Sequence, residues 1–362
     1  KAMAEHGDKV GADEKGKIVG RGPLDVWGWT NLDFASPYVD YVIQQTQEVC
    51  DLFGDEVDGF FFDIMFQQGV HSTWCMKRYT QQGLDPADPA SARLMREQVV
   101  NECADRLFGA VREKNKSCSV FFNGGHVSPA IRSRLSSYTH LELESLPTGG
   151  WGYMHFPITS RYARTLGRGF LAMTGRFNEM WGHFNSVKNP AALEYECLLA
   201  LALGGKCSVG DQLHPRGTLE STAYDLIGPV YRKVKSLEPW CEGAEPLAEI
   251  AVYNAEAFDA SGERIPPPSL GATRMLMEGR HQFDLVDTES DWTKYKVLIL
   301  PDVIKLDKRG AQKLHAWIQK GGSVIASFES LTASDGTLVP AFADALKEAT
   351  GESPHTPDFL KP

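Results

Sequence analysis

A single carboxylate, Asp63, ends a run of three phenylalanines in this chain. The stretch from Val57 to Ile64 has the apolar and aromatic density of a strand that is buried on both faces of a parallel sheet. An ionisable group at the end of such a strand costs free energy unless it is solvated, paired or used in chemistry. An aspartate that only caps the following segment is the plain alternative. We expect a functional role because the same arrangement recurs on later strands.

Four later strand candidates also end in polar or charged side chains. These side chains are Asn123 and His126, Glu142 and Glu144, Arg176 and Glu179, and Asp211 and His214. In a barrel of alternating strands and helices, the carboxyl ends of the strands form the active face. Because the strands in question end in carboxylates and amides, we expect that face to carry a reactive or binding site here.

Aromatic residues are concentrated in the loops that we expect on the same face. They are Trp27, Trp29, Trp74, Trp151, Tyr153 and Trp181. Aromatic rings pack against the C–H faces of sugars, and carboxylates and amides hydrogen-bond sugar hydroxyls, so this set predicts a carbohydrate site. For any one tryptophan, simple packing in a loop is the alternative. The predicted substrate-binding residues are Trp29, Asn123, His126, Glu142, Trp151, Tyr153, Glu179, Trp181, Asp211 and His214.

Two carboxylates at such a site suggest glycoside hydrolysis. We expect Asp63 to attack the anomeric carbon, and Glu144 to protonate the leaving oxygen and then deprotonate water. A retaining mechanism of this kind needs the two carboxyl groups about 5–5.5 Å apart. Glu142 lies two residues earlier on the strand, roughly 7 Å deeper, where a partner inside the barrel is expected. Glu179 is the alternative acid, and Glu194, in the middle of a helix, is expected to be structural.

Strand-like and helix-like segments alternate regularly along the first two thirds of the chain. Predicted strands end at Asp63 or cover 118–125, 139–144, 169–175 and 207–214, and predicted helices cover 36–52, 89–114, 128–136, 159–166, 190–203 and 219–237. Such alternation predicts an α/β fold with a parallel sheet and crossover helices. Five strand–helix units are too few for a (β/α)8 TIM-type barrel, so we expect residues 1–243 to be a barrel whose first three units are missing. An open doubly wound sheet is disfavoured because its G-x-G-x-x-G turn is absent.

A second domain is predicted at 246–352, followed by a tail at 353–362. Its strands are expected at 249–254, 295–301 and 323–327, and its helices at 274–282 and 307–320, with a loop at Pro266–Pro268. Pro301 and Ser327 end its clearest strands, so no nucleophile sits at a strand-to-helix turn. We therefore expect this domain to assemble subunits.

Composition excludes several classes of protein. A net charge of -10 over 362 residues argues against nucleic-acid binding, and no apolar run is long enough to span a membrane. The seven scattered cysteines predict reduced thiols in a cytoplasmic protein. Because the sequence has no Cys-x-x-Cys pair, we do not expect a structural zinc site. The polar segment 1–21 has no methionine start, so we expect the chain to begin partway through a domain.

Several motifs resemble one enzyme group. The stretch from Trp27 to Trp240 is similar to retaining α-L-fucosidase-type barrels through the segments 58–63, 142–147, 151–153 and 210–215. Residues 246–330 resemble the β-galactosidase trimerisation domain, a flavodoxin-like module, through 295–302 and 321–324. The resemblance implies an α-L-fucoside substrate, an oligosaccharide or glycoside partner and a homo-oligomeric trimer. Asp63 matches the family's nucleophile, which closes the fourth barrel strand, provided that three strands precede it. The position of the acid/base glutamate varies between families, so that role is not carried over.

Three alternatives stay open. In a metal-dependent hydrolase, His126, Asp211 and His214 would gather around an ion, but no His-x-His or His-Glu-x-x-His motif supports this, and we expect no metal and no cofactor. A β-galactosidase with the same layout normally uses two glutamates, which disfavours it beside Asp63. A non-catalytic sugar-binding or assembly protein would bind sugar without turnover.

Overall fold

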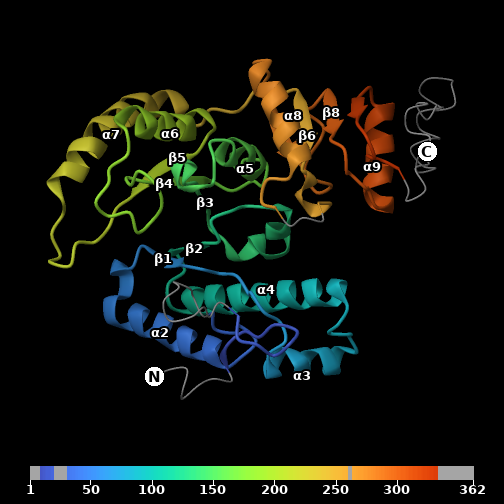
Figure 1. Cartoon of the computed structure of the whole chain (residues 1–362). Helices are drawn as coiled ribbons and strands as arrows, with labels where there is room; N and C mark the ends of the chain where they lie inside the picture. Colours follow the sequence, from blue (N-terminus) through green and yellow to red (C-terminus); the bar gives the residue numbers. More distant parts are fainter. Residues whose placement is uncertain (1–8, 20–30, 260–262, 333–362) are drawn as a thin grey trace. The chain divides into compact units, whose positions relative to one another are not determined.

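The computed structural model describes residues 9–19, 31–259 and 263–332, and these form two compact units (Figure 1). The first unit contains the described residues up to Gly124 together with Ile131–His140. The second contains Gly125–Ala130 and the described residues from Leu141 onward.

In its described residues, the first unit contains two parallel strands beside three α-helices. Its elements are α2 (Tyr38–Phe53), the 3-10 turn η2 (Gly54–Glu56), β1 (Gly59–Phe62), α3 (Thr73–Gln82), α4 (Pro89–Lys114) and β2 (Ser119–Phe122), and the 3-10 helix η3 (Pro129–Ser137) follows. Helix α2 packs along α4 (Figure 1). Helix α4 begins where the sequence predicts, because Asp88 accepts hydrogen bonds from the backbone N–H groups of Ala90 and Ser91, and Pro89 fits the first turn.

The second unit begins with three parallel strands in the order β3-β4-β5. Its first elements are β3 (Leu141–Glu144), η4 (Pro147–Gly149), α5 (His155–Ala163), β4 (Phe170–Gly175), α6 (Pro190–Ala202), β5 (Lys206–Gly210) and α7 (Ser221–Cys241). Helices α6 and α7 lie side by side (Figure 1) and share a core that includes Leu193, Ile227 and Val230. Burying a large aliphatic side chain of this kind stabilises the fold by about 1.5–3 kcal/mol.

The same unit continues into a four-stranded parallel sheet of order β7-β6-β8-β9. Its elements are β6 (Ile250–Tyr253), η5 (Ala255–Ala257), α8 (Pro267–Glu278), β7 (Phe283–Val286), β8 (Val297–Leu300), α9 (Lys308–Gln319) and β9 (Ser323–Ala326). The second strand in sequence lies outside the first, an order typical of doubly wound sheets.

The predicted α/β class with parallel sheets is confirmed. Within the described residues, the five strands of the predicted barrel form a sheet of two and a sheet of three, not a closed barrel. Eight parallel strands are needed to close this type of barrel, and five cannot do so. All seven cysteines are unpaired, and five of them are buried.

Several element boundaries differ from the prediction. Helix α8 begins at Pro267 and not at residue 274, because prolines that were assigned to a loop occupy its first turn. Helix α5 begins at His155, four residues early. Helix α3 was not predicted, since its apolar residues are few. Strand β7 was missed because Asp284 interrupts its apolar run.

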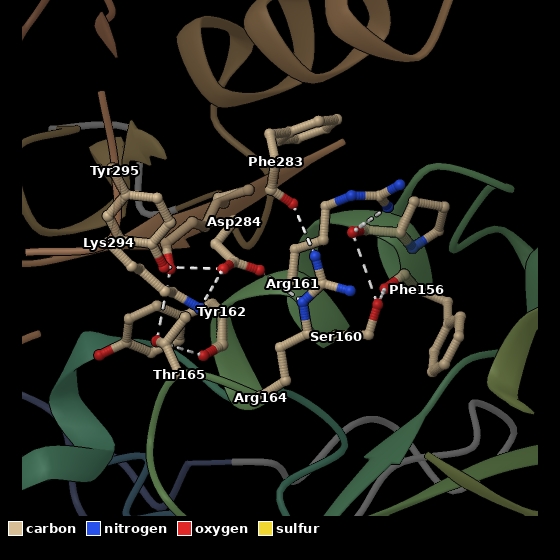
Figure 2. A network of polar contacts seen from close by, with 12 residues as sticks. Phe156, Ser160, Arg161, Tyr162, Arg164, Thr165, Phe283, Asp284, Lys294 and Tyr295 are labelled. Atoms are coloured by element: carbon tan, nitrogen blue, oxygen red, sulfur yellow. Dashed lines mark hydrogen bonds and ion pairs between the residues drawn. The ribbon is translucent and has the colours of Figure 1, made fainter. Parts of the chain in front are cut away.

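Helix α5 is joined to β7 by a buried polar network, which Figure 2 shows. Directly after α5, Arg164 donates through Nε to Asp284 Oδ1 at 2.5 Å and through a terminal nitrogen to the Phe283 carbonyl at 2.7 Å. Tyr295 donates to the other oxygen of Asp284 at 2.7 Å, and the Lys294 ammonium lies 2.9 Å from it. The fully buried Asp284 carboxylate thus has a partner for each oxygen, which offsets its desolvation.

Two further contacts extend this network. Tyr162 donates to Asp287 at 2.5 Å. The Arg161 guanidinium stacks on the Phe283 ring, 4.4 Å from its centroid, and both side chains are drawn in Figure 2. Burial lowers the pKa of Arg161 to about 10. The four-stranded sheet is therefore fastened to α5 by directional bonds as well as by apolar packing.

We expect Arg164→Met to destabilise the protein strongly, because it leaves the buried Asp284 carboxylate without its main cation. Breaking a buried pair in this way costs about 3–5 kcal/mol. The matched control is Lys233→Met, which removes an ion pair with Glu194 whose side chains are 49% and 41% exposed and which should cost less than about 1 kcal/mol. Urea unfolding measures both changes, and equal losses would contradict the role given to Arg164.

Candidate active site

Asp63 lies directly after β1, beside the residue that follows β2. The parallel register pairs Phe62 with Phe122, so Asp63 and Asn123 come next on their two strands at the same level. The Asn123 side-chain amide donates to Asp63 Oδ1 at 2.9 Å. Asn123 is buried, whereas Asp63 is exposed. A fixed amide therefore orients a carboxylate that solvent can reach.

The backbone after Asp63 is strained. Ile64 has a φ of 57°, a left-handed conformation that is unusual for a β-branched residue. The turn is held by the N–H of Met65, which donates to the Asn123 carbonyl at 3.0 Å. A few residues on, the buried Gln67 donates to Asp33 Oδ1 at 3.0 Å, which fastens this loop to the segment before α2. Strain of this kind is concentrated at functional sites.

A cavity of about 420 Å³ opens beside Asp63 in the first unit. Its walls are mainly apolar and come from the end of β1, from α2 and from α4, with Phe61, Val42 and Leu107 among them. Pockets for small ligands have volumes of about 300–1,000 Å³, apolar walls and a few polar groups. Asp63 and Asn31 are among the polar groups of this one.

In the second unit, Glu144 ends β3 and is held by a tryptophan. The Trp181 indole N–H donates to Glu144 Oε1 at 2.7 Å. The indole lies against the glycines that end β4 and β5, since a Cβ built on Gly210 would lie 2.1 Å from the ring and one on Gly175 would lie 3.6 Å from it. Only a residue without a side chain at position 210 leaves room for this ring.

The loop that carries Trp181 is shaped by an ion pair. Arg176, directly after β4, donates through Nε to Asp211 Oδ1 at 2.7 Å, and both side chains are largely buried. Arg176 also donates to the carbonyls of Phe184 and Ser186, at 3.0 and 2.8 Å. One guanidinium therefore joins the ends of β4 and β5 and fixes the connection between them.

A chain of hydrogen bonds runs behind β3. Ser145, the residue after Glu144, lies 2.5 Å from His155 Nδ1, and His155 Nε2 lies 3.1 Å from His126 Nδ1. His126 Nε2 lies 3.0 Å from Glu256 Oε2. Burial is the main cause that lowers the pKa of His155 to about 3, with smaller contributions from the neighbouring His126 and Arg264. His155 is therefore neutral at physiological pH.

The other predicted site residues lie in varied surroundings. Trp151 packs edge-on against His155, Tyr153 is exposed near Tyr195, Glu142 is buried within β3, Glu179 is exposed, His214 is half-buried and Trp29 lies outside the described residues. Glu194 is ion-paired with Lys233, as expected for a structural residue. Within residues 9–19, 31–259 and 263–332, no group of three His, Cys, Asp or Glu side chains is arranged to hold a metal ion.

Residues 274–362 match the family described as the β-galactosidase trimerisation domain. A solved structure, α-L-fucosidase isoenzyme 2 from Paenibacillus thiaminolyticus, is 38% identical to this chain with a TM-score of 0.87, over 93% of this chain and 52% of the other. The chain is related to glycoside hydrolases. The present chain spans about half the length of that fucosidase. The predicted resemblances to fucosidase-type barrels and to the β-galactosidase trimerisation domain are confirmed.

More distant structures share the fold alone. A β-galactosidase from Bacillus circulans sp. alkalophilus is 13% identical with a TM-score of 0.71, over 96% of this chain and 62% of the other. A β-galactosidase from the Antarctic haloarchaeon Halorubrum lacusprofundi is 14% identical with a TM-score of 0.70, over 95% and 64%. The search of curated protein sequences found no match to the present chain. None of its described helices combines the length and apolarity needed to cross a membrane.

Three residues of this region were missed from the sequence. Ser145 lies in the segment 142–147 but was not among the predicted site residues, His155 and Glu256 lie in no motif, and Glu256 is 130 residues from its partner His126. The position of Ser145 next to Glu144 is the one sequence feature that could have drawn attention to this chain of hydrogen bonds.

We expect His155 to make the free energy of unfolding of this protein decrease as the pH is lowered into the acid range. Between the ordinary pKa of 6.5 and the folded value of about 3, the unfolded chain binds a proton at His155 that the folded protein does not bind. Stability therefore falls as pH is lowered through this window, by up to about 1.4 kcal/mol per pH unit. In His155→Gln this contribution is lost, so the urea midpoint should change less between pH 6.5 and 4. Replacing the exposed His281 by Gln should leave the wild-type pH dependence, and an unchanged slope in His155→Gln would contradict the assignment.

Proposed function

We propose that this chain belongs to an enzyme that removes a terminal sugar, an α-L-fucoside, with retention of configuration. The observation that supports it best is that two carboxylates, Asp63 and Glu144, each follow or end a parallel strand and are each held by a fixed donor. The donors are the Asn123 amide and the Trp181 indole N–H. The 38% identity to an α-L-fucosidase supports the choice of sugar.

In the proposed first step, Asp63 attacks the anomeric carbon and the glycosidic C–O bond breaks. Glu144 gives its proton to the leaving oxygen, so a glycosyl ester on Asp63 and a free alcohol result. In the second step, Glu144 removes a proton from water, which attacks the same carbon and releases the sugar and the Asp63 carboxylate. The hydrogen bonds from Asn123 and Trp181 restrict the orientation of both carboxyl groups, which is the main contribution of the protein to such a step.

We propose that the surrounding side chains bind the sugar. The aromatic rings of Trp29, Trp151, Tyr153 and Trp181 would pack on its C–H faces, and Asn123, His126, Glu142, Glu179, Asp211 and His214 would contribute polar contacts to the site. Of those that the structure describes, Tyr153 and Glu179 have exposed side chains, and the Asp211 carboxylate is already engaged by Arg176. We expect Asp211 to act together with that guanidinium.

A panel of nitrophenyl glycosides tests the activity. We expect turnover of the α-L-fucoside, with the α-anomer as the first product seen by NMR. Turnover of the β-D-galactoside alone would favour a β-galactosidase, and sugar binding without any turnover would favour a non-catalytic protein. Asp63→Asn should abolish hydrolysis, and Asp58→Asn, at the start of the same strand segment, should not change it.

Glu144→Gln extends the same test to the second carboxylate. A nitrophenolate leaves without acid assistance, so the first step should persist while the second loses its general base, which contributes about 10²–10⁴-fold to the rate. The expected signature is a burst of nitrophenol followed by slow turnover. Steady turnover at the wild-type rate in Glu144→Gln would exclude Glu144 from the mechanism.

We further propose that the enzyme is a homotrimer, because its C-terminal residues match a trimerisation domain. Light scattering after size-exclusion chromatography should give a mass three times the chain mass of 40.0 kDa. A monomer mass at micromolar concentration would contradict this assembly.

A further inference from the structure

The hydrogen-bond chain behind β3 connects two parts of the second unit that are far apart in sequence. It starts at Glu256 in η5, just after β6, and ends at Ser145, next to Glu144. The links between them are His126 and His155. The chain therefore joins the four-stranded sheet to the strand that carries the proposed acid/base.

The chemistry of the four groups gives this chain a direction. The Glu256 carboxylate accepts, so His126 Nε2 carries the proton and His126 Nδ1 is an acceptor. His155 then donates through Nε2, and its Nδ1 accepts the hydroxyl proton of Ser145. Because His155 stays neutral, the hydrogen bond to Glu256 favours this tautomer of His126, and Thr159 Oγ1, 3.2 Å from His126 Nδ1, can donate to the same nitrogen.

Burial makes the links hard to replace by water. Ser145 and His155 are 4% and 1% exposed, and the side chains of His126 and Glu256 are 10% and 21% exposed. A buried polar group that loses its hydrogen-bond partner is destabilised, because no water replaces that partner. Ser145 is also too buried to act as a nucleophile. Its N–H donates to the Met173 carbonyl at 2.8 Å, so its position is tied to the register of β3 on β4.

The ring of His155 also packs against Trp151. The Trp151 ring stands at 89° to the His155 ring with centroids 4.8 Å apart, and the Arg264 guanidinium lies 4.6 Å from the Trp151 centroid. Gly125, with a φ of 70°, leaves room for the indole, since a Cβ there would lie 2.7 Å from it. His155 therefore contacts both His126, which Glu256 binds, and Trp151, on which Arg264 lies.

We propose that Glu256 is a positioning residue for the proposed active site. Through its hydrogen bonds by way of His126 and His155, Glu256 orients Ser145 and thereby fixes the position of the end of β3. This inference rests on the proposed function of Glu144. It assigns a catalytic contribution to a segment that would otherwise serve assembly alone.

Steady-state kinetics of Glu256→Ala and Glu256→Gln test the proposal. Glu256→Ala should lower kcat about tenfold, less than the loss of a general acid or base itself, with KM within about twofold. Glu256→Gln should recover part of kcat, because its amide oxygen can still accept from His126. The matched control is Glu249→Gln at the other end of β6, which removes an exposed ion pair with Lys296 and should not change kcat.

A double-mutant cycle shows whether Glu256 acts through the chain. If it does, Glu256→Ala should have little further effect on kcat in a Ser145→Ala background, whereas independent sites give additive losses. An active wild type whose kcat is unchanged by Glu256→Ala, or strictly additive losses, would overturn the inference. Absence of turnover of every glycoside by the wild type would instead contradict the proposed function, and the inference with it.

Nitrogen NMR of the histidine-labelled full chain gives a readout that does not need activity. His126 should carry its proton on Nε2 in the wild type and in Glu249→Gln, and should lose this fixed tautomer in Glu256→Ala. A wild-type His126 protonated only on Nδ1 would also overturn the inference.

Discussion

Parallel pairing of the strands is the constraint on which the site depends. It places the carboxyl ends of neighbouring strands at the same edge of each sheet, so residues far apart in sequence meet there. The register of β1 on β2 brings Asn123 to Asp63, and the register of β4 on β5 brings Arg176 to Asp211. A shift of one residue in either pair would turn each of these side chains to the other face. The site is therefore set by the backbone hydrogen bonds of the sheets before any side chain contributes.

The hydrogen-bond donors of Glu144 and Asp211 are themselves fixed by contacts with other residues. Trp181 lies on two glycines, and Arg176 is bound to two carbonyls of its own loop. Such supporting contacts keep a polar side chain in one orientation, at the cost of making the surroundings intolerant of change. The buried Asp284 follows the same rule at the contact between α5 and β7, where an unpaired carboxylate would be far more costly than in water.

Local patterns predicted the parts of the fold that local physics decides. The bounds of α4 follow from its Asp-Pro start and its helical periodicity, and the strand ends at Asp63 and Glu144 follow from apolar runs that stop at a charge. Strand β5 ends at Gly210, four residues before the predicted end at 214. Strand β7 was missed because a charge in mid-strand is acceptable only when Arg164, from another element, neutralises it. The start of α8 was misplaced because a proline run is compatible both with a loop and with a first helical turn.

The hydrogen-bonding partners of the site were harder to predict than its carboxylates. Nothing near Glu256 in sequence indicates that it meets His126, since their contact depends on how two sheets are joined. The pairing of Trp181 with Glu144 depends in the same way on the length of the loop after β4. Spacing shows which groups are present at an edge, whereas tertiary structure decides which of them touch.

Gly210 shows what this dependence means for variation in sequence. The nearest part of the indole would overlap with even a methyl group at this position, so the ring would have to move and would draw its N–H away from Glu144. The smallest residue of β5 thus fixes where the indole can lie, and a change that adds a single carbon atom there would alter the surroundings of Glu144, two strands away.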